Sequence, residues 1–342
     1  MKNPPCSRVT IVTLRITIQS YGMERISDEY GRTFRTLRVS LINHCNLGCI
    51  YCVAGEEELR QYNTGGQGQS LSVPELLEII RRLHDQLGLD TIRLTGGEPL
   101  LYTGLVELIG GIRSMGIPRI KLTTNGFLLG SVALSLKEAG MQSINVSLDA
   151  IDEAVFMRMS RRHSVQRIVR GIDAAQEAGL VVKINTVLMK GINDSEILPL
   201  LEFAFARGIR IRFLELMAMG HLYHQPGRYL LAQEEIIRVI ASRYVLTPLE
   251  RAASATARYW ETDAGHSFGI IANESEPFCR DCDRLRLDSS GNIYGCLSSN
   301  HPIALDRGES GEQWEIKLRQ ALGQKQSLRF TGSDLSMLRI GG

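Results

Sequence analysis

The chain has 342 residues, 44% of them hydrophobic and 22% charged, and its formal net charge is +2. This composition is ordinary for a soluble globular protein, and the length suits one large domain with a smaller one. It lacks the strong basic excess of a typical nucleic-acid-binding protein, and no run of about 18 apolar residues predicts a membrane helix.

The cysteine pattern favours a reducing compartment. Six of the seven cysteines fall into two tight triplets, which is a poor pattern for a disulfide framework. We therefore expect a cytoplasmic protein, since disulfides are rare there. The remaining cysteine, Cys6, has no recognisable partner and is assigned no function.

Residues 1–29 are predicted to form an N-terminal extension. The apolar run over residues 9–18 is interrupted by Arg15 and is followed by no small-residue cleavage site. We expect it to be a short extended segment and not a signal peptide.

Short apolar segments alternate with amphipathic ones from residue 37 onward. Strands are expected over 37–41, 91–95, 119–124, 143–148, 181–188 and 209–216, and helices over 73–87, 105–115, 129–139, 165–178, 196–206 and 233–243. Six βα units in series predict a parallel sheet with right-handed crossovers. Because a closed barrel needs eight, we expect an incomplete (β/α)6 barrel of the TIM type over residues 30–245, with its site at the carboxyl ends of the strands.

The first cysteine triplet, Cys45, Cys49 and Cys52, follows the first expected strand with the spacing C-x3-C-x2-C. Thiolates are the usual ligands of iron–sulfur clusters, and a cubane needs four, so three from one loop leave one iron open. The alternative is a zinc ion or a set of inert buried thiols. Structural zinc needs four ligands, usually as two pairs, and His44 is awkwardly placed to be the fourth.

The second expected strand ends in a Gly96-Gly97-Glu98-Pro99 turn. Two glycines let a backbone approach a ligand closely, and Glu98 and the adjacent carbonyls can accept hydrogen bonds from an ammonium group. By itself, such a turn is more often only a loop. Its position one strand after the cysteine triplet favours a ligand contact.

The second triplet is Cys279, Cys282 and Cys296, with the spacing C-x2-C-x13-C. Asp288 to Gly291 predicts a hairpin turn that folds Cys296 back toward the pair. Zinc is a strong alternative here, because C-x2-C is a common zinc motif and His301 could complete a Cys3His set.

Arg284 and Arg286 lie between the thiols of the second triplet. In an extended strand they point to the same side, about 7 Å apart. Such a pair suits a phosphate or a purine edge. The alternative is a solvated strand face.

The first triplet, with Tyr51 just before its last cysteine, resembles the signature of the radical S-adenosylmethionine (SAM) superfamily. Both triplets, the paired arginines and the terminal Gly341-Gly342 make the chain similar to the GTP 3′,8-cyclase family, also called molybdenum cofactor biosynthesis protein A, over roughly residues 30–342. The resemblance implies a partial barrel whose open side is covered by a smaller C-terminal α+β domain, residues 246–342, that carries a second iron–sulfur cluster. Met23 lies where chains of this family commonly begin and is an alternative translation start.

The resemblance also implies the chemistry. Two [4Fe–4S] clusters and SAM are the expected cofactors. The first cluster cleaves SAM to a radical that removes the ribose 3′-hydrogen of GTP, and C3′ then bonds to C8 of guanine. The product, (8S)-3′,8-cyclo-7,8-dihydroguanosine 5′-triphosphate, is made in the first step of molybdenum cofactor (molybdopterin) biosynthesis. The second cluster binds the guanine base, and arginines hold the triphosphate.

Residue roles follow from the same resemblance. The cluster ligands are Cys45, Cys49, Cys52, Cys279, Cys282 and Cys296. The catalytic residues are Cys45, Cys49, Cys52, Arg284, Arg286, Gly341 and Gly342. SAM is expected to contact Tyr51, Gly97, Glu98, Ser147 and Met217, and GTP to contact Arg38, Arg93, Thr123, Lys183, Arg212, Arg284 and Arg286.

The expected partners are GTP, cyclic pyranopterin monophosphate synthase as the next enzyme of the pathway, an electron-donor protein and a second copy in a homodimer, with no nucleic acid and no membrane. The chain departs from the family pattern at three places. Asn43-His44 stands before the first cysteine, where Asp-Arg is usual in the family. Thr91 stands where a phosphate-contacting lysine is common, and residues 61–69, rich in Gly and Gln, are expected to be an inserted loop.

Two other functions stay open from the sequence. One is a radical SAM enzyme with an auxiliary [4Fe–4S] cluster that acts on another substrate, such as a peptide. The other is a non-enzymatic zinc-binding module. The terminal Gly-Gly and the paired arginines favour the cyclase over the first, and metal content would separate both enzymes from the second.

Overall fold

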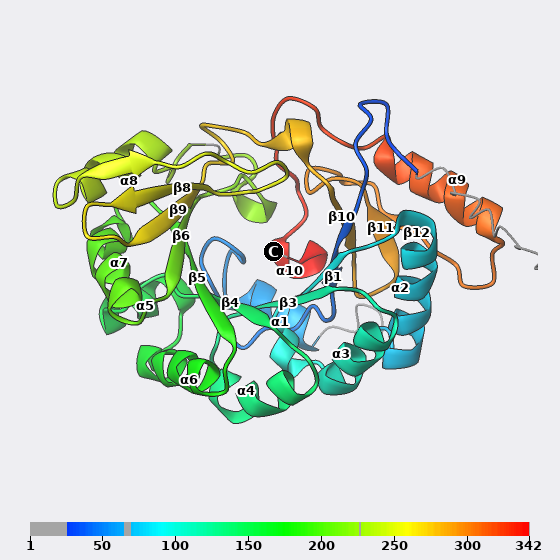
Figure 1. Cartoon of the computed structure of the whole chain (residues 1–342), viewed down its shortest axis with the longest axis horizontal. Coiled ribbons are helices and arrows are strands. Elements are labelled where there is room, and N and C mark those ends of the chain that lie inside the picture. Colours follow the sequence, from blue (N-terminus) through cyan, green and yellow to red (C-terminus); the bar gives the residue numbers. More distant parts are fainter. Residues whose placement is uncertain (1–25, 65–69, 226, 342) are drawn as a thin grey trace, which may run out of the picture.

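The computed structural model describes residues 26–64, 70–225 and 227–341. Cys6, Met23 and the apolar run of residues 9–18 therefore lie outside the described residues, as does Gly342. Figure 1 shows a curved sheet with helices along its outer side and the C-terminus inside the curve.

Six parallel strands form the centre of this sheet. They are β1 (Thr36–Ser40), β2 (Thr91–Thr95), β3 (Arg119–Thr124), β4 (Ser143–Ser147), β5 (Val181–Leu188) and β6 (Arg210–Glu215). The expected helices follow them as α2 (Val73–Leu87), α3 (Leu105–Ser114), α4 (Leu129–Glu138), α6 (Val165–Glu177), α7 (Ile197–Ala206) and α8 (Gln233–Ala241). The predicted alternation is confirmed, with ends shifted by no more than two residues.

The C-terminal part of the chain extends the sheet at both of its edges. Next to β1 come β10 (Arg284–Leu287), β11 (Asn292–Tyr294) and β12 (Ile303–Ala304); next to β6 come β9 (Ser267–Ile271), β8 (Arg258–Thr262) and β7 (Leu246–Pro248). β7 and β12 are the two ends of this one sheet, so the barrel is incomplete, as predicted. The domain boundary at residue 245 stays a prediction, because the sheet continues on both sides of it.

Local sequence explains why α2 begins and ends where it does. The N–H and the hydroxyl of Ser72 both donate to Oε2 of Glu75, at 2.8 and 2.7 Å, and Pro74 suits the first turn. The helix ends where Gly88 adopts φ +64° and its N–H donates to the carbonyl of His84 at 2.8 Å.

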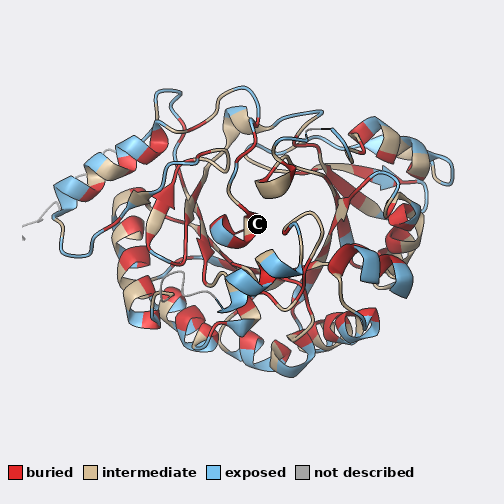
Figure 2. Ribbon diagram, turned by 180° about the vertical axis from the view of Figure 1, so that it is seen from behind, coloured by how far each residue is buried: buried red, intermediate tan, exposed pale blue. Residues whose placement is uncertain are grey.

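The core lies between the strands and the outer helices, whose buried stripes face the sheet in Figure 2. In β3, Ile120 and Leu122 are 2% and 0% exposed and belong to the same buried cluster as Leu108 and Ile112 of α3. Because side chains alternate along a strand, Lys121 and its inward-facing equivalents on the other strands point into the barrel. The interior of the barrel is therefore polar.

Several elements were not predicted. α1 (Glu56–Thr64) and α5 (Glu153–Ser160) both contact the first cysteine loop. α9 (Gly311–Leu322) and α10 (Met337–Ile340) occur near the C-terminus. The expected inserted loop over residues 61–69 is wrong in its first part, since residues 61–64 complete α1; residues 65–69 lie outside the described residues. Glu56, Glu57 and Glu58 in the first turn favour this helix through its dipole.

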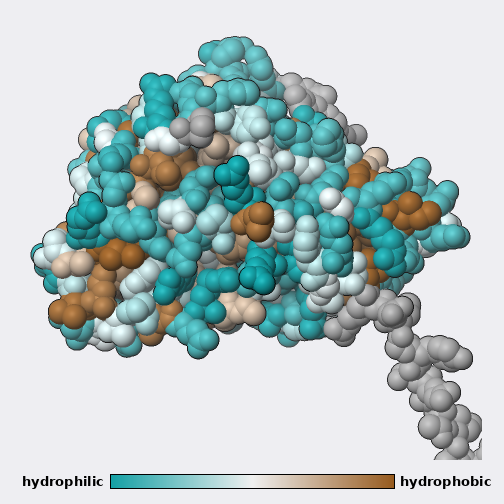
Figure 3. Space-filling view, turned by 90° about the horizontal axis from the view of Figure 1, so that it is seen from above, coloured by the Kyte–Doolittle hydropathy of each residue, from teal (hydrophilic) through white to brown (hydrophobic). Residues whose placement is uncertain are grey.

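No helix in the described ranges is long and apolar enough to cross a bilayer. The face of the molecule in Figure 3 is mostly hydrophilic, with apolar residues in separate small patches. Scattered apolar residues of this kind are normal on a protein surface.

Candidate active site

A cavity of about 640 Å³ lies inside the curve of the sheet. All six cysteines of the two triplets line it, although the triplets are far apart in the sequence. Inward-facing residues of β1 to β6, β9 and β10 and part of α10 complete the wall. The structure thus brings the two predicted metal-binding segments to one space.

The first triplet lies in a loop that is anchored to the end of α5. The N–H groups of Gly48 and Ile50 donate to the carbonyls of Ser160 and Met159, both at 2.9 Å. Arg161 then donates to the carbonyls of Gly48, Val53 and Ala54, at 2.7 to 3.1 Å. No local sequence pattern indicates this support, because Arg161 follows an unpredicted helix.

The thiols of the first triplet are in surroundings that disfavour the thiolate. Burial and then the Glu98 carboxylate raise the pKa of Cys45 to about 12. Burial and the neighbouring Cys45 raise the pKa of Cys52 to about 12, and burial followed by Asp149 raises the pKa of Cys49. Because metals bind thiolates, a cationic metal centre would supply the charge that favours deprotonation here.

In the described part of the chain, no three His, Cys, Asp or Glu side chains are placed to hold one metal ion. A [4Fe–4S] cluster makes a different demand, because each thiolate binds a different iron. The thiols of Cys45, Cys49 and Cys52 come from one loop, line one cavity and lie close enough for their charges to interact. This donor set fits a cluster with one iron left for an added ligand.

The Gly96-Gly97 turn is needed for contact with the first cysteine loop. A Cβ on Gly97 would lie 2.1 Å from the carbonyl oxygen of His44, and one on Gly96, at φ +152°, would lie 2.7 Å from that of Ile42. The N–H of Gly97 donates to the Ile42 carbonyl at 2.6 Å. Both glycines also line the cavity, so the same bare backbone serves the loop and the cavity wall.

Glu98 does not occupy the position predicted for it. It is 0% exposed and does not line the cavity, and its carboxylate accepts from the N–H groups of Leu100 and Asn125 and the hydroxyl of Thr124, at 2.6 to 3.0 Å. Burial raises its pKa to about 7. The expected contact between the Glu98 side chain and a ligand is therefore wrong. The side chain is buried outside the cavity and binds the backbone and side chains of residues next to it.

The other residues predicted to contact SAM lie on the wall. Tyr51, Gly97, Ser147 and Met217 all line the cavity. The hydroxyl of Tyr51 donates to Oδ2 of Asp149 at 2.9 Å, and burial raises the pKa of Asp149 to about 6. Their roles toward a cofactor stay predictions.

Among the described residues, six arginines line the same cavity, and one of them, Arg119, is paired with Asp90 at 2.9 Å. The other five form what we call the cationic wall: Arg38, Arg93, Arg212, Arg284 and Arg286. Arg38 lies opposite Arg93 in the sheet on one side and opposite Arg286 on the other. Burial, followed by the charges of the nearby arginines, lowers the pKa of Arg93 to about 10, and burial above all does the same for Arg286. An anion would relieve this repulsion, so the wall suits a polyanionic ligand.

Thr123 lines the cavity, whereas Lys183 is half-buried on β5 and does not line it. Burial and the charges of Arg212 and Lys121 lower the pKa of Lys183 to about 8. Thr91 lines the cavity too, and its hydroxyl accepts from Nε of Arg119 at 2.9 Å. A guanidinium group from β3 therefore reaches the side chain of Thr91.

The second triplet is shaped by a short turn and a hairpin. Cys279 begins a 3-10 turn (Cys279–Asp281), and the N–H of Cys282 donates to the Cys279 carbonyl at 3.2 Å. The predicted turn between β10 and β11 is confirmed, since these strands pair antiparallel and return the chain toward Cys296. His301, the alternative zinc ligand, is exposed and does not line the cavity.

Lys325 gives the second triplet a positive neighbour. Its Nζ donates to Sγ of Cys282 at 3.4 Å and to the carbonyl of Arg284, and it lies 4.9 Å from the centre of the Phe34 ring. Burial raises the pKa of Cys282, but the charges of Lys325 and Arg284 outweigh burial and bring the pKa down to about 7. Burial and the neighbouring thiols raise the pKa of Cys279 to about 11, so thiolate character is favoured at Cys282 and not at Cys279. The donor set again fits a cluster.

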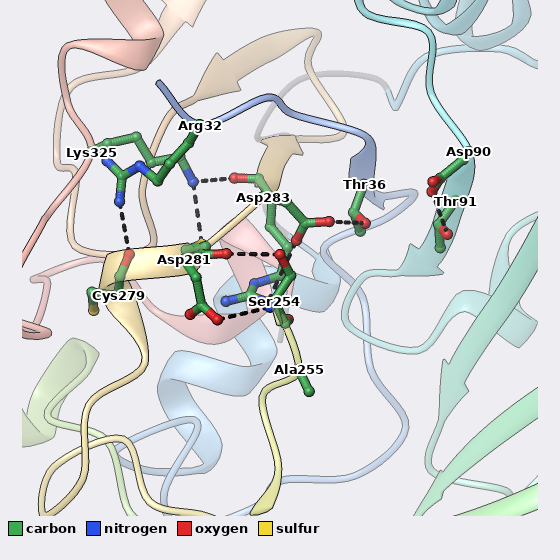
Figure 4. Close-up of polar contacts among 12 residues, drawn as sticks. Arg32, Thr36, Asp90, Thr91, Ser254, Ala255, Cys279, Asp281, Asp283 and Lys325 are labelled. Carbon is green, nitrogen blue, oxygen red and sulfur yellow. Dashed lines mark hydrogen bonds and ion pairs between the residues drawn. The ribbon is translucent and has the colours of Figure 1, made fainter. Parts of the chain in front are cut away.

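Arg32 ties the N-terminal part of the described chain to the second triplet, as Figure 4 shows. Its Nη1 donates to the carbonyls of Cys279 and Gln326, at 2.7 and 3.0 Å, and its guanidinium pairs with Asp28 at 2.6 Å. Arg32 and Lys325 were not predicted, because no local pattern links them to cysteines so far away in the sequence.

The C-terminal segment enters the barrel beside both triplets. Ser336 donates through Oγ to the carbonyl of Cys52 at 3.0 Å, and Arg286 donates to the carbonyl of Gly341. Gly341 has φ +75°, and a Cβ there would lie 2.8 Å from Cγ2 of Thr95 and 3.0 Å from Cβ of Ser40. Only glycine fits this position without strain.

Comparison with known proteins agrees with this geometry. The sequence profile of the Radical SAM superfamily matches residues 39–204, and that of Molybdenum Cofactor Synthesis C matches residues 209–331. A GTP 3′,8-cyclase of Synechocystis sp. is 38% identical over 315 residues, which cover 92% of this chain and 94% of that protein. One of Corynebacterium glutamicum is 37% identical, covering 94% and 90%. The chain belongs to the GTP 3′,8-cyclase family.

Solved structures show the same fold at greater distance. Streptococcus suis SuiB bound to the precursor peptide SuiA has a TM-score of 0.59 at 17% identity, over 85% of this chain and 66% of that one. Native anSMEcpe with bound AdoMet has a TM-score of 0.55 at 12% identity, over 85% and 83%. At this identity the likeness is one of fold alone, and it confirms the radical SAM partial barrel for this member of the GTP 3′,8-cyclase family.

Proposed function

We propose that this member of the GTP 3′,8-cyclase family converts GTP to (8S)-3′,8-cyclo-7,8-dihydroguanosine 5′-triphosphate, with SAM and two [4Fe–4S] clusters. The reaction joins C3′ of the ribose to C8 of guanine and is the first step of molybdenum cofactor biosynthesis. The observation that carries the proposal is one cavity lined by both cysteine triplets and by the five arginines of the cationic wall.

The order of residues along the strands supports this arrangement. The first triplet follows the carboxyl end of β1, whereas Cys279 and Cys282 precede the amino end of β10, which pairs parallel with β1. Cys296 follows β11, which pairs antiparallel with β10 and so returns the chain to that end. Arg38 and Arg286 are partners in the pairing of β1 with β10 and so lie between the carboxyl end of β1 and the amino end of β10. A nucleoside triphosphate held by these arginines would lie within reach of both ends of the cavity.

When bound at the first triplet, a cluster supplies the electron for reductive cleavage of SAM. The residues of the chain bind and orient SAM and GTP and shield them from water. The arginines would offset the charge of the triphosphate, and Tyr51, Ser147 and Met217 line the space beside the first triplet. Gly341 packs against Thr95, which is itself a cavity residue. Exclusion of water protects a radical reaction from side reactions.

The test is an anaerobic incubation of the iron-reconstituted protein with SAM, dithionite and GTP. We expect 5′-deoxyadenosine and the cyclised triphosphate to accumulate together, and neither to form when SAM is left out. Replacing GTP by ATP is the control. SAM cleavage without loss of GTP would refute the substrate assignment while leaving the radical SAM chemistry in place.

The predicted partners belong to the same proposal. The product would pass to cyclic pyranopterin monophosphate synthase, and an electron-donor protein would replace dithionite. The homodimer and the cytoplasmic location stay predictions.

A further inference from the structure

Lys121 of β3 is a cavity residue that the predicted site does not include. It lines the cavity and is half-buried. Its two strand neighbours, Ile120 and Leu122, are buried on the opposite face, so the ammonium group points into the barrel. Within the described ranges, Lys121 makes no hydrogen bond and no ion pair.

Strand pairing places Lys121 in the row of cationic side chains. It lies opposite Arg93 of β2, which in turn lies opposite Arg38 of β1. Arg93 also lines the cavity and, in the described part of the chain, has no hydrogen-bond or ion-pair partner. Two adjacent strands therefore present neighbouring cations that form no ion pair within the described ranges, although Asp283 acts on Arg93 and Asp90 acts on Lys121 from a greater distance.

The acids near this row already have partners. Asp283, whose charge acts on Arg93, accepts from the hydroxyl of Thr36 at 3.1 Å and lies 3.7 Å from Arg284. Asp90 pairs with Arg119 at 2.9 Å and with Arg35 at 3.4 Å. Repulsion is evident at Lys121, where burial first, and then the charges of Arg93 and Arg119, lower its pKa. Like charges held together in a partly desolvated wall are unfavourable unless a ligand brings the opposite charge.

We propose that Lys121 is a further phosphate-binding residue, which together with Arg93 holds the polyphosphate chain of a nucleoside triphosphate. This inference rests on the proposed use of GTP and adds β3 to the strands that bind it. An ammonium group is a compact charge with three donors and suits a phosphate oxygen.

Arg119 is the matched control on the same strand. It precedes Lys121 by two residues, lines the cavity and carries the same charge. Unlike Lys121, it is ion-paired with Asp90, donates to Thr91, and has a side chain that is 52% exposed. Loss of a charge that is already paired should matter less than loss of an unpaired one.

The experiment measures equilibrium binding of GTP, inorganic triphosphate and SAM to the anaerobically reconstituted full chain and to its Lys121→Gln, Lys121→Arg and Arg119→Gln variants. For Lys121→Gln we expect affinity to fall about tenfold for GTP and for triphosphate, as for loss of one charge-assisted hydrogen bond. SAM affinity should not change. Lys121→Arg should keep most of the affinity that Lys121→Gln loses. Arg119→Gln should weaken the binding of GTP and triphosphate by about twofold or less.

Unchanged binding of GTP and triphosphate to Lys121→Gln would overturn the proposal. Equal losses for triphosphate and SAM would overturn it as well, because the effect would then not be specific to phosphate. If the unaltered chain binds triphosphate but not GTP, the GTP assignment fails by itself. The effect of Lys121→Gln on triphosphate binding still decides the role of Lys121 in that case.

Discussion

The two cysteine triplets of this protein carry the same ligands, but one thiol of the second triplet has opposite electrostatic surroundings. Burial and the neighbouring thiols raise the pKa of Cys279 to about 11, so the contrast with the first triplet lies at Cys282. Around the first, Glu98 and Asp149 add to burial and raise the pKa of the thiols of Cys45 and Cys49. Around the second, Lys325 and Arg284 overcome burial and lower the pKa of Cys282 to about 7. Spacing alone therefore does not define a thiol site, because residues distant in the sequence set its charge.

The two triplets also differ in how they are held. The first is a continuous loop tied to the end of α5 by Arg161. The second depends on separate segments, with Arg32 on the Cys279 carbonyl and with Ser254 donating to Asp281 at 2.8 Å (Figure 4). We expect the second site to be the more sensitive to changes elsewhere in the chain.

The largest expected effect separates the two triplets directly. Cys49→Ala should remove the first cluster and abolish formation of 5′-deoxyadenosine, because the electron donor to SAM is lost. Cys282→Ala should remove only the second cluster. Each variant should keep about half of the iron and sulfide of the unaltered protein, measured after anaerobic reconstitution. Loss of all iron in either variant would show that the two sites do not assemble independently.

A smaller effect is expected where the C-terminal segment joins the two regions. Gly341→Ala should lower turnover about tenfold or more, because the new Cβ at φ +75° meets Thr95 and Ser40. Iron content should be unchanged. Gly311→Ala is the control, since no atom lies within 4 Å of a Cβ there. Full activity of Gly341→Ala would contradict the fit seen at the end of the chain.

Removal of the cation beside the second triplet should act on that triplet alone. Lys325→Met deletes the hydrogen bond to Cys282 and should make loss of iron from the second site to a chelator about tenfold faster. Iron in the first site should be released at its usual rate. Lys317→Met is the control, because Lys317 pairs with Glu309 in a half-buried ion pair and does not line the cavity that holds the triplets. Equal release from both sites would mean that Lys325 acts on the fold as a whole.

The smallest expected effect is the change of GTP affinity with pH, through Lys183 near the cationic wall. Burial and the charges of Arg212 and Lys121 lower the pKa of Lys183 to about 8, so the free protein loses this positive charge as pH rises through that value. Because GTP is an anion, its binding favours the protonated form of Lys183. Its affinity should therefore fall about fivefold between about pH 7.5 and 9.5. Lys183→Met should bind GTP more weakly at pH 7.5 and show a flatter pH profile. A profile as steep as that of the unaltered protein would exclude Lys183 as the titrating group.

The sequence by itself determined the order and type of the six central strands and their helices, because hydrophobic period and helix-ending glycines are local signals. It also determined the hairpin after Arg286 and the inward pairing of Arg284 and Arg286, since strand alternation is fixed by the backbone. Motif spacing and the family resemblance were enough to predict the partial barrel, which the structure confirms.

Only the tertiary structure decided which polar groups share the cavity. It placed Glu98 behind the wall, where local protein donors occupy its carboxylate, and it brought Lys325 to Cys282 and Lys121 to Arg93. Such contacts join segments that the sequence separates by tens to hundreds of residues. They arise from strand pairing and burial, which no local pattern encodes, and the charge of a buried site depends on them.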